Sequence, residues 1–302
     1  MPILVRVELG EPESADAVAP VVQLVASGTA SRYRCVPLRV RPPFRNAYER
    51  WCDVEIAVGL DRSLGLSWDQ YRELGRLAAR LGYQSVWTNA SIDRDAMQIC
   101  AQWSVASADV APGGIGTGLS VVPVGYWSVP ALASSAATVG EISGGKFVLG
   151  VGSGSLHLPA FRRSLGLDKN LRPLATMREW LVTLRALLAG ETVTHEGQAI
   201  TLRGITLGSK PPKVPVALGA LGPNMLRLAG EASDGASLNW CTPEQVASSR
   251  EIVVRGAHAA GRPEPGGHDR VHPNLRGRRR GRGPPRLHQG SDGIRASVAR
   301  HE

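Results

Sequence analysis

The chain is poor in cysteine and has no long apolar run. Its four cysteines, at positions 35, 52, 100 and 241, are scattered and show no Cys-x-x-Cys spacing. This usage is typical of a reducing compartment rather than a disulfide scaffold or a zinc site, so we expect a cytoplasmic protein without a metal centre. Because no run of about eighteen apolar residues occurs, no membrane-spanning helix is expected. Residues 1–20 also lack the apolar segment of a secretory signal.

Lysine is scarce as well, since arginine supplies all but four of the 35 basic residues. The formal net charge is +9, and much of it lies in residues 263–302, which hold nine arginines against four acidic residues. Residues 53–262 carry a net charge of only +2. Basic tails can bind nucleic acid. The nearly neutral central part nevertheless makes nucleic acid an unfavoured partner.

The two ends of the chain differ in pattern from the part between them. Residues 263–302 form a basic, low-complexity tail without apolar period, and we expect no core strand there. The excess of arginine over lysine is typical of GC-rich coding DNA. Such DNA read in a shifted frame yields arginine, glycine, proline and histidine. A frameshift is therefore the favoured explanation, with a functional, nucleic-acid-binding tail as the alternative. Residues 1–52 form an irregular N-terminal extension. A start codon assigned too far upstream would explain it, and a mobile N-terminal arm is the alternative. An inactive, poorly soluble truncated product is thus a second hypothesis for the chain.

The central part, residues 53–262, alternates strand and helix patterns with short connections. The expected strands are 54–60, 84–89, 114–122, 147–151, 214–218 and 235–239, and the expected helices are 68–81, 95–107, 129–142, 171–188, 224–232 and 243–260. Six βα units in this order predict an α/β fold of the TIM-like (β/α)8 barrel type that is incomplete at the C-terminus. A doubly wound open sheet is the alternative. A hairpin pattern at 193–207 follows the fourth helix pattern.

Glycines cluster after two of the expected strands. One cluster is Gly150-Val-Gly152-Ser-Gly154, and the other, Gly219-Ala-Leu-Gly222-Pro223-Asn224-Met225, opens directly into a helix pattern. Glycines at such positions let the backbone approach a phosphate or a flat ring, and a helix N-terminus adds N–H donors and positive dipole. The two clusters therefore predict a phosphate-bearing cofactor laid across the strand ends.

Several motifs in the same order resemble the bacterial-luciferase-like flavin monooxygenase superfamily. They are Gly116-Thr-Gly118-Leu119, the run from Ala136 to Gly154, and Leu221-Gly-Pro-Asn-Met-Leu-Arg-Leu-Ala-Gly230-Glu-Ala-Ser-Asp234-Gly. The last motif is similar to the branch that uses coenzyme F420, and within it to methylenetetrahydromethanopterin reductase-like proteins. The resemblance implies a TIM-like barrel with an insertion after strand four, expected as the helix and hairpin of residues 171–207. It also implies hydride transfer between F420 and a small organic substrate, with an FMN-dependent monooxygenase as the alternative.

The resemblance also assigns cofactor-binding positions. It places a non-prolyl cis peptide bond between Gly118 and Leu119, behind the ring, although Gly118 also suits a plain β-bulge. It places the side of the ring at Gly152, Ser153 and Gly154, for which a Rossmann-type glycine loop is the alternative. A phosphate or tail site is expected at Gly222, Pro223, Asn224 and Met225. The alternative there is a purely structural helix start.

The catalytic residues are not evident from the sequence. Asn89 and Ser91, after the second expected strand, are candidates to hydrogen-bond the edge of the ring. Asp93 or Asp95 suits a helix cap better than catalysis, and His157 suits a surface loop. Ser155 occupies the position where sugar-phosphate dehydrogenases of the family carry a glutamate, so that activity is not expected. A complete barrel of this family would be expected to form a homo-oligomer.

Overall fold

The computed structural model describes residues 20–21, 38–39, 57–60, 65–90, 92–167, 171–208, 211–262 and 272–274. Two short strands, β1 (Pro20–Val21) and β2 (Leu38–Arg39), pair with each other outside the main sheet. Within the described residues no helix is long and apolar enough to span a membrane.

The main sheet is built of parallel strands whose spatial order follows the chain. They are β3 (Ala57–Leu60), β4 (Ser85–Thr88), β5 (Gly116–Pro123), β6 (Phe147–Gly152), β9 (Val216–Gly219), β10 (Gly235–Asn239) and β11 (His272–Asn274). Every pairing in this sheet is parallel. A doubly wound sheet reverses its strand order at a switch point. The uninterrupted order therefore excludes that alternative and confirms the barrel prediction.

The sheet is strongly curved, as a barrel wall is. Strands β5 and β10 are separated by two intervening strands, which in a flat sheet amounts to about 14 Å. The hydroxyl oxygens of Ser120 on β5 and Ser237 on β10 nevertheless lie 2.6 Å apart. The sheet must therefore curl around a common interior, into which both serines project.

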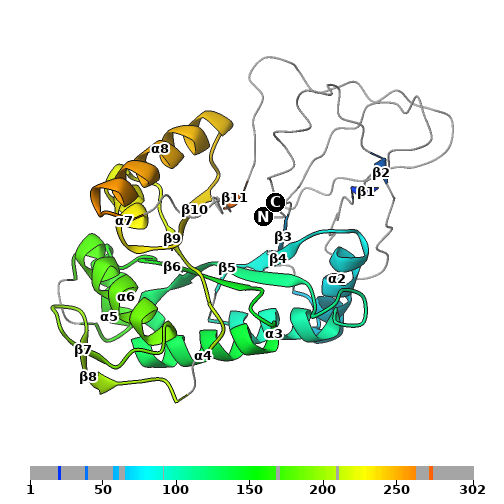
Figure 1. Ribbon diagram of the computed structural model, residues 1–302, viewed down its shortest axis with the longest axis horizontal. Coiled ribbons are helices and arrows are strands. Elements are labelled where there is room, and N and C mark those ends of the chain that lie inside the picture. Colours follow the sequence, from blue (N-terminus) through cyan, green and yellow to red (C-terminus); the bar gives the residue numbers. More distant parts are fainter. Residues whose placement is uncertain are drawn as a thin grey trace.

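Helices cover the outer face of this sheet in chain order (Figure 1). They are α2 (Trp68–Arg80), α3 (Ala96–Ala106), α4 (Val129–Ile142), α6 (Pro173–Leu188), α7 (Pro223–Ala232) and α8 (Pro243–Ala259). Each contacts the next, and α6 lies between α4 and α7. The predicted helix-plus-hairpin insertion therefore divides into two parts. Helix α6 is the barrel's own fourth helix, and the hairpin of β7 (Val193–Glu196) and β8 (Thr201–Ile205) is added to it.

Side-chain caps explain where several helices begin. Ser67 accepts a hydrogen bond from the backbone N–H of Gln70, whose side chain accepts one from the N–H of Ser67, and this capping box starts α2. Thr242 and Gln245 form the same arrangement at α8. The carboxylate of Asp95 accepts a hydrogen bond from Met97 at the start of α3. The prediction that one of the two aspartates caps this helix is thus confirmed for Asp95.

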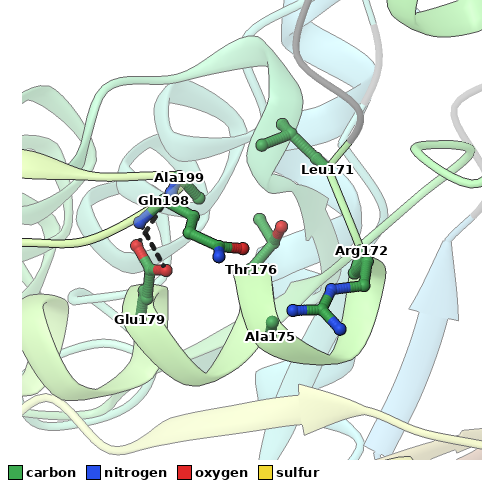
Figure 2. Close-up of a pocket in the computed structure, with 7 residues that line it drawn as sticks. All are labelled: Leu171, Arg172, Ala175, Thr176, Glu179, Gln198 and Ala199. Carbon is green, nitrogen blue, oxygen red and sulfur yellow. Dashed lines mark hydrogen bonds between the residues drawn. The ribbon is translucent and has the colours of Figure 1, made fainter.

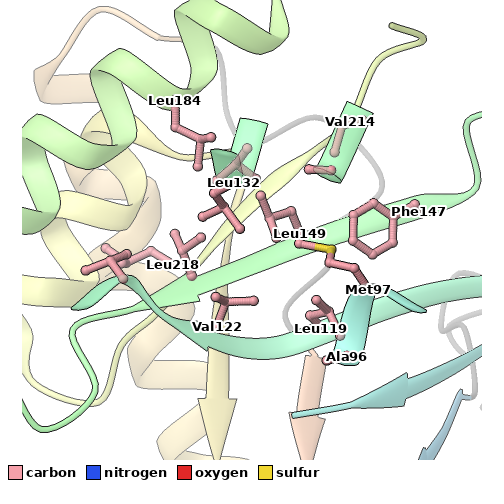
Figure 3. Packing of buried hydrophobic residues seen from close by; sticks show 14 of the residues in the cluster. Ala96, Met97, Leu119, Val122, Leu132, Phe147, Leu149, Leu184, Val214 and Leu218 are labelled. Carbon is pink, nitrogen blue, oxygen red and sulfur yellow. The ribbon is translucent and has the colours of Figure 1, made fainter. Parts of the chain in front are cut away.

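The core has two layers, one on each face of the sheet. Between sheet and helices, Leu149 of β6 and Leu218 of β9 pack with Leu132 of α4 and Leu184 of α6, all without exposed surface (Figure 3). Inside the curve, a smaller cluster joins Trp87, Val148 and Ala217. The outer layer is the larger, so most of the apolar burial fastens helices to the sheet.

Asp234 fastens the N-terminal face of the barrel. Its carboxylate accepts a hydrogen bond from the backbone N–H of Val216 at 2.9 Å and two from the guanidinium of Arg185 at 2.9 and 3.3 Å. Arg262 lies 3.7 Å away and itself donates to the carbonyls of Gly230 and Ser233. This group of contacts joins α6, β9 and the end of α8 on the face opposite the strand C-termini.

One sequence-based expectation about the sheet changes. The prediction that residues 263–302 supply no core strand is wrong for His272–Asn274, which pair in parallel with β10 as β11. Three residues suffice because the neighbouring strand supplies the ladder of hydrogen bonds. The rest of the predicted tail and most of residues 1–52 lie outside the described residues.

Candidate cofactor site at the strand ends

The C-terminal ends of the parallel strands meet on one face, where (β/α) barrels hold their active sites. The two glycine clusters predicted from the sequence lie side by side on this face, because β6 pairs with β9 in the register Gly150 to Ala217 and Val151 to Leu218. We call this region the mouth and define it by the ends of β4, β5, β6, β9 and β10.

A bulge in β5 forms the floor of the mouth. The pairing of β5 with β6 shifts register between Leu119 and Val122, and the peptide bond between Ser120 and Val121 is cis. Ser120 reaches across the interior to Ser237, and Val121 lies against the glycines of neighbouring strands. Both side chains therefore face the interior, instead of alternating as in a regular strand.

Three glycines leave room for Val121. An added Cβ would lie 2.8 Å from its methyl carbon Cγ2 at Gly152 and 3.1 Å from Cγ1 at Gly219. At Gly150 an added Cβ would also meet the carbonyl oxygen of Leu119 at 2.0 Å. The glycines thus add no side chains to the floor around Val121. A flat ring fits such a surface.

The predicted position of the cis bond is wrong by two residues. Gly118 and Leu119 are joined by a trans bond, and both are buried. Leu119 has no exposed surface and belongs to the layer between sheet and helices, so its side chain does not reach the mouth. Gly118 is small for another reason, since a Cβ there would meet the ring of Trp87 at 2.5 Å. Ser120 and Val121 take the place that the sequence assigned to this pair.

The loop after β6 forms one wall and is held by its own contacts. Ser153 accepts a backbone hydrogen bond from Leu156, and Arg162 donates to the carbonyl of Leu156 at 2.7 Å. Leu156 is buried against Gly125 of the short helix η2 (Val124–Tyr126). Gly154 has a φ of 54°, which glycine adopts without strain. Gly152, Ser153 and Gly154 are therefore placed at the mouth on a fixed loop.

The N-terminus of α7 borders the mouth after β9. Gly222 is the N-cap, no side chain caps the helix, and the first turn holds no acidic residue. A Cβ added at Gly222 would meet nothing within 4 Å, so the space above it is open. Arg227 donates to Oδ1 of Asn224 at 2.9 Å, which leaves the amide NH2 of Asn224 as a donor. The side chain of Met225 is partly buried and packs against the core. An anionic group fits here.

The remaining polar candidates contribute less to the mouth. Asn89 is half-buried at the end of β4, next to Ala90, whose N–H donates to the carbonyl of Val121. His157 is exposed, and Ser91 lies outside the described residues. Burial raises the pKa of the Cys100 thiol, which points away from the mouth toward the carbonyl of Gly118, so it is no nucleophile. The geometry assigns no acid or base, and among the described residues no cluster could hold a metal ion.

A separate pocket of about 180 Å³ lies on the outside of the barrel between α6 and the β7–β8 hairpin (Figure 2). In it the carboxylate of Glu179 accepts hydrogen bonds from the backbone N–H groups of Gln198, Ala199 and Ile200 at 2.9–3.0 Å. Burial raises the pKa of Glu179, but these donors and His195 outweigh burial and leave it below its ordinary value. Glu179 therefore serves to hold the turn of the hairpin, and the pocket is smaller than most ligand sites.

The sequence is matched from residue 53 to residue 271 by the model of the family described as luciferase-like monooxygenase. The chain belongs to the luciferase-like monooxygenase family. It is 35% identical over 188 residues to the 5,10-methylenetetrahydromethanopterin reductase of Methanolobus tindarius, a match that covers 62% of this chain and 55% of the relative. The chain thus spans about half the length of the curated relative.

Solved structures share the fold. The coenzyme F420-dependent tetrahydromethanopterin reductase from Methanopyrus kandleri superposes with a TM-score of 0.57 at 22% identity, over 69% of this chain and 62% of that one. An FMN complex of the oxygenating constituent of 3,6-diketocamphane monooxygenase from Pseudomonas putida gives 0.56 at 17% identity, over 69% of this chain and 64% of that one. These likenesses confirm the barrel fold.

Sequence reasoning missed Ser120, Val121 and Ser237 at the mouth. A regular alternation through β5 would put Val121 on the outer face, and only the bulge turns it inward. Ser237 reads as an ordinary strand residue, because its partner is 117 positions away. The one available signal was the number of small residues at the ends of β6 and β9, which indicates that something else fills the space above them.

Proposed function

We propose that the protein is an oxidoreductase that transfers hydride between coenzyme F420 and a small organic substrate. The observation that carries this proposal is the floor of the mouth, where Val121 rests on Gly150, Gly152 and Gly219 beside the open N-terminus of α7. A flat ring and an anionic tail need these two surfaces side by side. The sequence likeness to relatives that are named as F420-dependent dehydrogenases supports the choice of cofactor.

In this proposal each part of the cofactor has a named surface. Val121, the loop of Gly152, Ser153 and Gly154, and Asn89 at the end of β4 would hold the ring. The first-turn N–H groups of Asn224 and Met225 and the side-chain amide of Asn224 would donate hydrogen bonds to the phosphate. The cofactor supplies the hydride chemistry, and the protein supplies position and exclusion of water.

The binding preference of the purified protein tests the proposal. F420 and FMN are added separately, and binding is followed by the fluorescence of each cofactor at constant ionic strength. We expect F420 to bind and FMN to bind at least about tenfold more weakly, which corresponds to about 1.4 kcal/mol. Tight binding of FMN with none of F420 would make the protein an FMN-dependent monooxygenase, an alternative that the fold of the FMN complex supports.

The cellular setting follows from this proposal. A hydride-transferring enzyme with buried free thiols, here Cys100 and Cys241, suits the cytoplasm. A small-molecule substrate enters from the open side of the mouth, above the cofactor. A homo-oligomer is part of the proposal for a complete barrel, and sedimentation of the purified protein measures it.

A further inference from the structure

Trp240 adopts an unusual conformation at the end of β10. Its φ is 54°, the only positive φ of a non-glycine residue among the described residues, and 70% of its surface is exposed. A bulky residue in the left-handed region is strained, and an exposed indole gains little from the hydrophobic effect. Such strain is found where the surroundings enforce it, often at functional sites.

The residues that follow Trp240 fix its position. Cys241 is buried and its thiol lies 3.5 Å from the carbonyl oxygen of Asn239, so the chain turns tightly around Trp240. Thr242 then caps α8 through the box with Gln245. Strand β10 thus ends one residue before Trp240, and helix α8 begins three residues after it. A left-handed residue makes this short turn possible, although glycine would meet that need without strain.

Trp240 directly follows the C-terminal end of β10, which places it at the mouth. Strands β9 and β10 pair Ser237 with Gly219, and the N–H of Ala220 donates to the carbonyl of Ser237. Leu221, two residues after the end of the neighbouring strand β9, is 65% exposed. Two large apolar side chains are therefore exposed where these two strands end.

We propose that Trp240 is a binding residue whose indole packs against a flat conjugated ring held in the mouth, with Leu221 completing the apolar wall. This inference rests on the proposed function, because it requires a ring on the floor formed by Val121. An indole offers a large, flat, rigid surface with only two side-chain torsions to fix, and such surfaces suit ring stacking. The ring belongs either to the cofactor or to a pterin-like substrate above it.

The test compares Trp240→Ala and Trp240→Phe with the unchanged protein and with Val105→Ala. Val105 is 63% exposed on α3, on the helical outside of the barrel, and controls for the loss of an exposed apolar side chain. Dissociation constants are measured for F420 alone, for FMN alone, and for tetrahydromethanopterin added to the F420-loaded protein. Urea midpoints are recorded for all variants.

We expect Trp240→Ala to weaken one ligand about tenfold, since stacking of a ring on an aromatic side chain is worth that order of magnitude. Trp240→Phe should recover most of this loss, and Val105→Ala should change nothing. A loss for F420 or FMN assigns the ring of the cofactor, and a loss confined to tetrahydromethanopterin assigns the ring of the substrate. Either result supports the inference.

Unchanged constants for every ligand in Trp240→Ala overturn the inference and leave the proposed function standing. An unchanged protein that binds neither F420 nor FMN overturns the proposed function and the inference with it. Should Trp240→Ala fail to fold, Trp240→Gly takes its place, because glycine accepts a φ of 54° without strain and keeps the turn. Equal urea midpoints for Trp240→Gly and the unchanged protein, together with weaker binding, support the inference.

Discussion

Replacing Asp234 with alanine should destabilise the fold by about 3 kcal/mol. The carboxylate is only 23% exposed and receives three hydrogen bonds, one from Val216 and two from Arg185, with Arg262 a further cation nearby. Each hydrogen bond to a charged group contributes about 1.5–3 kcal/mol, and partial exposure of Arg185 reduces the sum. The alanine variant also leaves the Val216 N–H without its carboxylate acceptor.

Equilibrium unfolding in urea measures this loss. Glu196→Ala is the matched control, because the Glu196 carboxylate lies 3.5 Å from Arg203 in a pair whose side chains are 76% and 78% exposed. Such a surface pair is worth about 0–1 kcal/mol. Since Asp234 lies on the face opposite the mouth, the folded Asp234→Ala protein should bind cofactor as the unchanged protein does. A free energy of unfolding within 0.5 kcal/mol of the unchanged value would refute the reasoning.

Three further predictions concern the core, the hairpin and the interior. Leu149→Ala should lower the free energy of unfolding by about 2–5 kcal/mol, because the side chain is fully buried between sheet and helices, and urea unfolding measures it. Glu179→Gln should cost about 1–2 kcal/mol at neutral pH. The pKa of Glu179 is lowered in the folded protein, so its contribution to the free energy of unfolding is full above the unfolded pKa of about 4.3 and is lost as pH falls through the folded pKa. Urea unfolding measured from pH 7 to about 3 should therefore show the stabilities of the two proteins converging. Ser237→Ala should cost about 1 kcal/mol through the lost bond to Ser120, again by urea, and an unchanged midpoint would contradict the bond across the interior.

Local signals in the sequence predicted the helices well. The starts of α2, α3 and α8 follow from Ser67, Asp95 and Thr242, whose side chains cap backbone N–H groups only a few residues away. The expected helices 68–81, 129–142 and 224–232 begin within one residue of the observed α2, α4 and α7. Because these interactions lie within one turn of helix, no knowledge of the tertiary fold was needed.

Features that depend on contacts between distant strands were not predicted correctly. The family resemblance placed the cis bond between Gly118 and Leu119, whereas the glycine at position 118 leaves room for the ring of Trp87 on β4. The bulge that turns Ser120 and Val121 inward depends on contacts with β6 and β10. The sequence of β5 alone does not show where those two strands lie.

Strand β11 was also not predicted from the sequence. A composition rich in arginine, glycine and proline argued against any strand after residue 262, yet three residues pair with β10 as far as Asn274. The hypothesis of a frameshift stays a prediction, and the nucleotide sequence of codons 262–274 tests it. We expect an error in the frame close to that strand, and an error-free confirmation of the tail would contradict the hypothesis.

The central claim is that a deazaflavin ring rests on Val121 above the glycines of β6 and β9. The most direct measurement is the dissociation constant of F420 for the unchanged protein, Gly152→Val and the control Gly208→Val, whose added Cβ would meet nothing within 4 Å. A side chain at Gly152 would occupy the floor, since its Cβ alone lies 2.8 Å from the Val121 methyl carbon. We predict at least about tenfold weaker binding for Gly152→Val and no change for Gly208→Val. Equal binding by all three proteins would contradict the account.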